Sequence, residues 1–291
     1  MIDRTVDAAL QDLTGRLLPL SLHAAQCEQF IQEYSRFDRG LVAHALAAAV
    51  KSLVNEYLIL VAQLDSDARA QSAHTMSLQK LYYYLTPTLQ TMQTICDLIS
   101  DLVAAGKTCK GGRILNLIYT KCQKASGYVL LFQTSYFSRR PTSLADDRFS
   151  DPNAKSLYTN LLIHAARPYL DMLRIWLNAG SIVDPYDEFM IVERRSKMVK
   201  KEALTDEYND VYWEQRYGIR TEEAIVPEFL ARFKSEILLA GKYWNVMREC
   251  GRPIDWQIKE KASLPSADLQ NQKSHFCLTS RRGHQVLMSR R

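Results

Sequence analysis

Three blocks of sequence between residues 182 and 251 decide how this 291-residue chain is interpreted. They read IVDPYDEFMIV (182–192), DEYNDVYWEQRYGI (206–219) and IVPEFLARFKSEILLAGKYWNVMRECG (225–251). The first block contains an Asp184-Pro185 turn, the second is rich in tyrosine, and the third has apolar residues at helical spacing. None of the blocks contains a phosphate-binding loop or a metal-ligand cluster. We therefore interpret the segment as a docking and folding element of a structural protein.

The third block predicts the last helix of the chain. Pro227 fits the first turn of a helix, and the apolar residues that follow recur at intervals of three and four. This spacing predicts one buried face, formed by Phe229, Phe233, Ile237, Ala240, Trp244 and Met247. Trp244 is expected to be a core residue.

Upstream, the same periodicity predicts three further helices. Residues 41–64 are apolar almost all round, which is typical of a helix at the centre of a bundle. Residues 78–103 form a second helix, in which Pro87 is expected to cause a kink or a break, and Gly106 ends it. Residues 113–125 form a shorter helix after Gly111-Gly112.

A fourth upstream helix has clear start and stop signals. Asp151 can cap its N-terminus, Pro152 suits its first position, and Gly180 can adopt the left-handed conformation that ends a helix. Pro168 predicts a bend. The predicted buried face consists of Leu157, Leu161, Leu162, Ala165, Tyr169, Met172, Leu173 and Trp176. Together these patterns predict an all-α fold, with the helix at residues 41–64 at the centre of a bundle.

The charge distribution argues against nucleic-acid binding. The chain has a net charge of +5, but residues 252–291 contain eight Lys or Arg against three Asp or Glu. This leaves 29 charges of each sign in residues 1–251, so the body is neutral and has no clustered basic face. Residues 252–291 also show little periodicity, and we expect them to be disordered.

Cysteine usage and hydropathy indicate a cytosolic protein without a membrane span. The six cysteines (Cys27, Cys96, Cys109, Cys122, Cys250, Cys277) contain no CxxC pair, and the first residues carry early charges rather than an apolar signal region. The most apolar stretch, residues 53–64, is interrupted by Asn55, Glu56 and Gln63. We expect reduced thiols and a buried helix.

Asp184, Asp187 and Glu188 are close enough in sequence to serve as a paired acid and base. Asp184 before proline is also a turn former, and clustered acids are common at surfaces, so the structural interpretation is preferred.

The basic run at residues 194–201 could contact an acidic partner, although a solvated helix face is the favoured interpretation.

The remaining motifs predict no catalytic, cofactor-binding or metal-binding residue. Gly106-Lys107-Thr108 follows a helix and lacks the earlier glycine of a phosphate loop. The histidines, His44 and His164 among them, have no metal-ligand spacing. The aromatic cluster of Tyr208, Tyr212, Trp213 and Tyr217 has acidic neighbours that would repel phosphates, so we interpret it as core or protein interface.

Several ordered blocks carry a resemblance to a known family. DPYDEFMIVE (184–193), EYNDVYWEQRY (207–217) and VPEFLARFKSEILLAGKYWNVMRECG (226–251) resemble the gamma-tubulin complex components, most closely the component 2 branch. GLVAHALAAAVKSLVNEYLILVAQLD (40–65), SLQKLYYYLTPTLQTM (77–92) and the Gly111-Gly112 pair before ILNLIY are similar to the same family in the same order.

The resemblance implies a fold and a role. Residues 1–251 would form the N-terminal grip domain, an all-α set of stacked helical bundles. Residues 252–291 would be a divergent tail in place of the C-terminal gamma-tubulin-binding domain. The chain would be a non-enzymatic subunit that supports microtubule nucleation at centrosomes or spindle poles. Its partners would be component 3 and other paralogues, with gamma-tubulin held indirectly. A helical-rod adaptor or vesicle-tethering subunit is the alternative, and an enzyme is a third interpretation.

Overall fold

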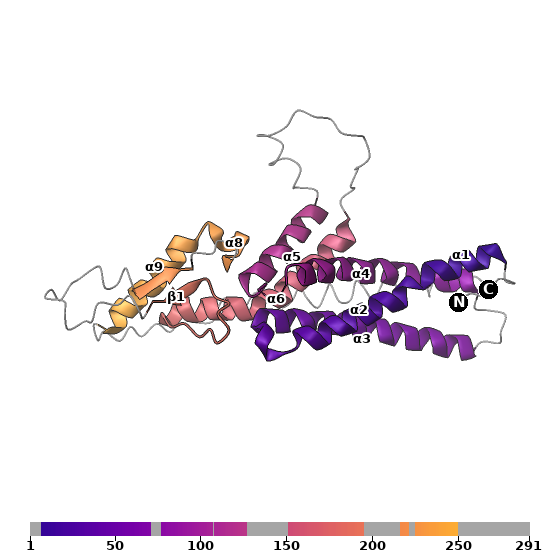
Figure 1. Ribbon diagram of the computed structural model, residues 1–291, viewed down its shortest axis with the longest axis horizontal. Helices are drawn as coiled ribbons and strands as arrows, with labels where there is room; N and C mark the ends of the chain where they lie inside the picture. Colours follow the sequence, from indigo (N-terminus) through magenta and orange to yellow (C-terminus); the bar gives the residue numbers. More distant parts are fainter. Residues whose placement is uncertain are drawn as a thin grey trace, which may run out of the picture. The chain divides into compact units, whose positions relative to one another are not determined.

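The computed structural model describes residues 7–70, 77–106, 108–126, 151–194, 216–220 and 225–249. Figure 1 shows its elements in chain order. They are α1 (Ala8–Leu17), α2 (Pro19–Tyr34), the 3-10 helix η1 (Phe37–Arg39), α3 (Leu41–Ala70), α4 (Leu78–Ala104), α5 (Gly112–Ala125), α6 (Pro152–Ala179), β1 (Ile191–Glu193), β2 (Tyr217–Ile219), α8 (Glu228–Ala231) and α9 (Lys234–Glu249). The predicted helical fold is confirmed, with one small antiparallel sheet added, in which Val192 pairs with Gly218.

Helix α3 lies between two groups of helices. It packs against α6, which also contacts α5, and against α2, which also contacts α4 (Figure 1). The first half of α3 is in the core: its buried residues are Val42, Ala43, Leu46, Ala47, Val50 and Val54. The prediction of a central helix is therefore confirmed for the part between Leu41 and Val54.

The second half of α3 differs from the prediction, because it is apolar but exposed. Leu58 and Ile59 are 49% and 58% exposed, and Val61 is also exposed. By length and composition, residues 41–69 alone among the described helices could cross a membrane, with a mean hydropathy of 1.6. Core helices of soluble proteins meet the same criterion, and the first half of α3 is such a core helix.

Local sequence signals set the ends of α6. The Asp151 side chain accepts hydrogen bonds from the backbone nitrogens of Asn153 and Ala154, and Pro152 occupies the first turn. At the other end, Gly180 has φ of 61° and its N–H donates to the Trp176 carbonyl. The predicted start and stop of this helix are confirmed. The predicted buried face is confirmed except at Leu157 and Leu162, which are half-buried.

The two internal prolines do not divide their helices. Pro87 lies inside the continuous helix α4, and Pro168 lies inside α6. Of the kink or break expected at Pro87, the break does not occur, since α4 runs without interruption from Leu78 to Ala104. The kink at Pro87 and the bend at Pro168 stay predictions. Helix α5 begins at Gly112, as the Gly111-Gly112 pair predicts, and Gly111 has φ of 52°.

The last predicted helix is divided, and its core face is rotated from the prediction. Helix α8 ends at Ala231 and α9 begins at Lys234. The residues of α9 that face the core are Ile237, Gly241 and Asn245, at intervals of four. Trp244 is half-buried and Phe233 is exposed. The prediction that Trp244 is a core residue is wrong, because a glycine and an asparagine occupy the inner face instead.

Helices α1 and α2 were not predicted from the sequence. Asp7 caps α1 through a hydrogen bond from the Ala9 nitrogen, and Pro19 begins α2. Helix α2 contributes Leu20, Cys27, Phe30 and Tyr34 to the core. The aromatic residues 208–213 and the tail 252–291 lie outside the described residues, so the predictions made for them stay predictions.

Candidate functional site

The loop between α6 and β1 contains the acidic cluster that the sequence singled out. Asp184 accepts hydrogen bonds from the backbone nitrogens of Glu188 (2.9 Å) and Phe189 (2.8 Å). These bonds close the turn over Pro185, so the turn-forming role predicted for Asp184 is confirmed. Asp187, at the tip of the turn, has φ of 60°, a left-handed conformation that aspartate tolerates.

Glu188 is not a surface acid, because only 1% of it is exposed to solvent. Its carboxylate accepts hydrogen bonds from the backbone nitrogens of Leu41 (2.6 Å) and Val42 (3.3 Å), which begin α3. It also accepts one from Gly111 (3.1 Å), the residue that precedes α5. One buried carboxylate therefore satisfies the free N–H groups at two helix N-termini, where a negative charge is favourable.

Two glycines make room for this carboxylate. Gly40 has φ of 97°, and Gly111 has a positive φ as well. A Cβ atom on Gly111 would lie 2.5 Å from the Glu188 carbonyl oxygen, which is too close for any side chain. Neither helix start offers a Ser, Thr, Asp or Asn cap of its own at these positions. Gly40, Gly111 and Glu188 together connect the N-termini of α3 and α5, and we call this contact the first joint.

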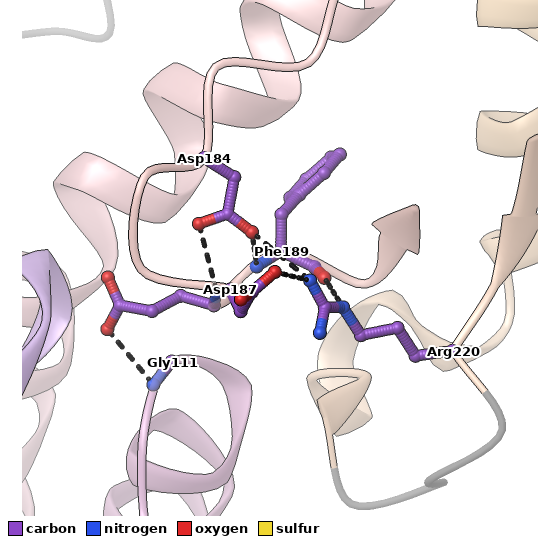
Figure 2. Close-up of polar contacts among 6 residues, drawn as sticks. Gly111, Asp184, Asp187, Phe189 and Arg220 are labelled. Carbon is purple, nitrogen blue, oxygen red and sulfur yellow. Dashed lines mark hydrogen bonds and ion pairs between the residues drawn. The ribbon is translucent and has the colours of Figure 1, made fainter. Parts of the chain in front are cut away.

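Arg220 connects β2 to the same loop. It donates from Nη2 to Asp187 Oδ1 (2.6 Å) and from Nε to the Phe189 carbonyl (3.0 Å), as Figure 2 shows. Its backbone nitrogen also donates to the Met190 carbonyl (2.9 Å). The loop is consequently held from both sides, by Asp184 within the turn and by Arg220 across the small sheet.

Burial sets the electrostatics of the joint. It raises the pKa of the Glu188 carboxyl above its ordinary value, while the amide donors of Leu41, Val42 and Gly111 oppose that rise. Burial also raises the pKa of Tyr169, whose ring packs against Phe189 with centroids 5.5 Å apart. The carboxylates of Asp184 and Glu188 are occupied by backbone amides, which supports the structural interpretation of the cluster.

A second joint fastens α9 to the end of α6. Asn245 is fully buried and donates from Nδ2 to the carbonyls of Gly180 (2.6 Å) and Gly241 (2.9 Å). Its Oδ1 accepts from the Tyr217 hydroxyl (3.3 Å) and from Arg248 (2.5 Å). This asparagine therefore links two helices and β2 through a single side chain.

Trp176 completes the second joint. Its indole nitrogen donates to the Ile237 carbonyl (2.7 Å), and its ring meets that of Tyr217 edge-on at 5.1 Å. Tyr217 was predicted to lie in the core or in a protein interface, and the structure places it in the core, where it is buried. Gly241 lies directly against the indole, where a Cβ atom would overlap the ring.

A third polar contact attaches the segment before α8 to α5. Asn116 donates from Nδ2 to the Val226 carbonyl (2.9 Å) and accepts from the Glu228 nitrogen (2.7 Å). We call this contact the third joint. Each of the three joints contains residues of the sequence blocks and holds together helices that are distant in sequence. The blocks therefore stabilise the packing of the helices.

The other candidate residues lie apart from these joints. His44 is exposed, His164 is half-buried, and Gly106 follows α4 with φ of 76°. Of the basic run, Arg194 donates to the Ile219 carbonyl (3.3 Å), and residues 195–201 lie outside the described residues. Within the part of the chain that the structure describes, no group of three or more His, Cys, Asp or Glu could hold a metal ion.

Comparison with known proteins assigns the chain to a family. A family model described as "Gamma tubulin complex component N-terminal" matches residues 1–285. The chain belongs to the gamma-tubulin complex component family. The resemblance inferred from the sequence is thereby confirmed. The match extends beyond residue 251, and the predicted domain boundary at that residue stays a prediction.

The curated relatives point to one branch of the gamma-tubulin complex component family. Gamma-tubulin complex component 2 of Mus musculus is 35% identical over 261 residues, which cover 90% of this chain and 25% of the relative. Component 2 of Arabidopsis thaliana is 34% identical, with 90% and 34% covered. Spindle pole body component alp4 of Schizosaccharomyces pombe is 29% identical over 306 residues, with 91% and 35% covered. The chain thus spans a quarter to about a third of their length.

Proposed function

We propose that this chain is a structural subunit that supports microtubule nucleation at a microtubule-organizing centre, through lateral contact with other components of the gamma-tubulin complex. The observation that carries the proposal is the match to component 2 relatives over 90% of the chain. The spindle pole body name of the fission yeast relative supports the location. Component 3 and other paralogues are the proposed direct partners, and gamma-tubulin is held indirectly.

The described helices support a scaffold role. The three joints use the buried side chains of Glu188 and Asn245 and the half-buried side chain of Asn116 to fix helices against each other. The acids singled out as catalytic candidates are engaged in the first of these joints. We propose that residues 1–251 act as the N-terminal grip domain, with residues 252–291 as a separate tail. The proposal assigns no catalytic residue, cofactor or metal to the chain.

The exposed half of α3 is the surface that we propose for the lateral contact. Leu58, Ile59 and Val61 are exposed together on one helical segment, and contiguous exposed apolar residues mark interaction sites. The proposed occupant is the corresponding helical domain of a paralogous component. An apolar surface of this kind would form the centre of such an interface, surrounded by polar residues such as Asn55 and Asp65.

The test is a pull-down with the full 291-residue chain as bait and purified component 3 as prey, with gamma-tubulin added in a second step. We expect component 3 to bind the bait in the absence of gamma-tubulin. Gamma-tubulin is expected to be recovered only when component 3 is present. Ile59→Lys is expected to reduce recovery at least tenfold. Ile163→Lys, on an exposed isoleucine of α6, is the matched control and is expected to bind as the parent does.

Two results would count against the proposal. Failure of the parent chain to recover component 3, under conditions where a full-length component 2 does so, would refute lateral contact. Equal loss in Ile59→Lys and Ile163→Lys would refute the α3 surface while leaving the complex membership intact. Localisation separates the adaptor alternative: a tagged chain on membrane vesicles rather than at spindle poles would favour the vesicle-tethering function.

A further inference from the structure

Two cysteines from different helices meet in the core of the α2–α4 contact. Cys27 Sγ and Cys96 Sγ lie 3.9 Å apart, and the two residues are 69 positions apart in sequence. Cys27 is 0% exposed and Cys96 is 5% exposed. Both are free thiols. Their sulfurs are therefore in contact without a covalent bond.

The surrounding contacts hold the two helices in register at this point. Gln26, next to Cys27, donates from Nε2 to Ser100 Oγ (3.2 Å). Further along both helices, the Tyr34 hydroxyl donates to the Leu102 carbonyl (3.5 Å). A disulfide has sulfurs about 2.05 Å apart, so the pair has roughly 2 Å to close. Closing that distance requires rotation of the two side chains, with an adjustment of the helices.

The two thiols have different environments. Cys96 Sγ contacts the His23 carbonyl (3.5 Å) in addition to Cys27. The hydrogen bond from Cys27 lowers the pKa of Cys96, and the same interaction together with burial raises the pKa of Cys27. Since the thiolate is the reactive form, Cys96 is the sulfur that reacts first. It is also the one with residual exposure.

We propose that Cys27 and Cys96 form a redox-active pair that a peroxide converts into a disulfide joining α2 to α4. The Cys96 thiolate attacks one oxygen of hydrogen peroxide, the O–O bond breaks, and hydroxide leaves. Cys96 becomes a sulfenic acid. The Cys27 sulfur then attacks the Cys96 sulfur, and water leaves as the S–S bond forms. Two thiols are oxidised by two electrons, and one peroxide is reduced to two waters.

The disulfide would tighten the N-terminal helices. It would close a loop between residues 27 and 96, and a constraint of that length restricts the unfolded chain considerably. In a reducing compartment such pairs are transient and respond to oxidants, so the bond would form under oxidative stress and be reversed by thiols. The consequence is a helical body whose stiffness depends on the redox state of its surroundings.

Cys109 and Cys122 provide matched controls within the same chain. Both are partly buried, and Cys122 Sγ lies 3.3 Å from Thr159 Oγ1 rather than from a sulfur. Burial raises the pKa of the Cys109 thiol. Neither residue is expected to form the disulfide, so Cys109→Ser and Cys122→Ser should behave as the parent does.

The experiment treats the reduced full chain with hydrogen peroxide, alkylates the remaining thiols, and maps the peptides by mass spectrometry without reduction. We expect a linked peptide pair containing Cys27 and Cys96, which disappears after dithiothreitol. The midpoint of thermal unfolding is expected to rise by about 10 °C in the linked form. Cys27→Ser should leave Cys96 to oxidise further to the sulfinic acid.

Several outcomes would overturn the proposal. Full alkylation of Cys27 and Cys96 after peroxide treatment that oxidises the other cysteines would show that the pair is inert. Links from either residue to another cysteine, or sulfinic acid on Cys96 of the parent chain without a link, would show that the two sulfurs do not combine. Because the parent chain alone decides between these results, the test stands even if Cys27→Ser fails to fold.

Discussion

Glu188 Oε2 lies 2.6 Å from the backbone nitrogen of Leu41, although 147 residues separate them in sequence. The other oxygen of the same carboxylate lies 3.1 Å from the nitrogen of Gly111. A single side chain therefore supplies the acceptor at the starts of α3 and α5. Because these two helices both pack against α6, the position of Glu188 determines how the centre of the helical body is arranged.

Glu188→Gln is expected to destabilise the chain by about 1–3 kcal/mol at pH 7, since the amide keeps one acceptor and points an N–H₂ donor at the helix amides. Urea unfolding followed by circular dichroism measures this change. Asp65→Asn is the control, because the Asp65–Arg69 pair is exposed and such pairs contribute about 1 kcal/mol or less. Equal free energies of unfolding for Glu188→Gln and the parent would contradict the claim that the Glu188 carboxylate stabilises the starts of α3 and α5.

Asn245→Ala is expected to cost about 1–3 kcal/mol, because the carbonyls of Gly180 and Gly241 would lose the hydrogen bonds from the Asn245 side-chain amide in a buried position. Thermal unfolding of the purified variant measures the loss. Tyr243→Ala, two residues away on the exposed face of α9, should change the free energy of unfolding by at most about 0.5 kcal/mol. A similar effect of both substitutions would show that Asn245 is not a fastening residue.

Trp176→Ala is expected to cost about 3–5 kcal/mol, the range for removal of a fully buried aromatic side chain. Trp244→Ala should cost clearly less, because Trp244 is half-buried on the flank of α9. Chemical unfolding of the two variants side by side gives the order. If Trp244→Ala proved the more damaging substitution, the inner face of α9 would have to be the one that hydrophobic spacing predicts.

Tyr158 makes the stability of the chain sensitive to high pH. Burial raises the pKa of Tyr158 to about 12, and its hydroxyl donates to the Thr94 carbonyl. A group whose pKa is raised in the folded state contributes stability below its ordinary pKa, about 10, and that stability is lost as pH rises through 12. Absorbance at the tyrosinate band should show one component near pH 12 that is missing in Tyr158→Phe, and titration of all tyrosines near pH 10 would contradict the burial.

The sequence predicts the helices best where the signals are local. Helix α6 is predicted from end to end, since Asp151, Pro152 and Gly180 act within a few residues of its ends and its buried face is uninterrupted. Helix α4 is predicted in extent, although Pro87 is accommodated without the expected break. The family resemblance is likewise carried by contiguous blocks of residues and is confirmed.

The features that were missed depend on partners distant in sequence. The helix starts at Leu41 and Gly112 lack a cap residue of their own, and that lack, together with a preceding glycine, is the signal that could have indicated an external acceptor such as Glu188. Hydrophobic spacing placed Trp244 inward because it counts only apolar side chains. On the inner face, Gly241 allows α9 to approach the Trp176 indole closely, and Asn245 forms buried hydrogen bonds. A pattern of apolar residues detects neither role.

The distance along the chain between Leu41 and Glu188 also has a consequence for biosynthesis. A ribosome that adds about 5–20 residues per second releases the start of α3 on the order of 10 s before its acceptor exists. During that interval the first turns of α3 and α5 have exposed amide groups and depend on water or temporary partners. The centre of this helical body is therefore completed only when the loop containing Glu188 emerges and joins two helices that are already made.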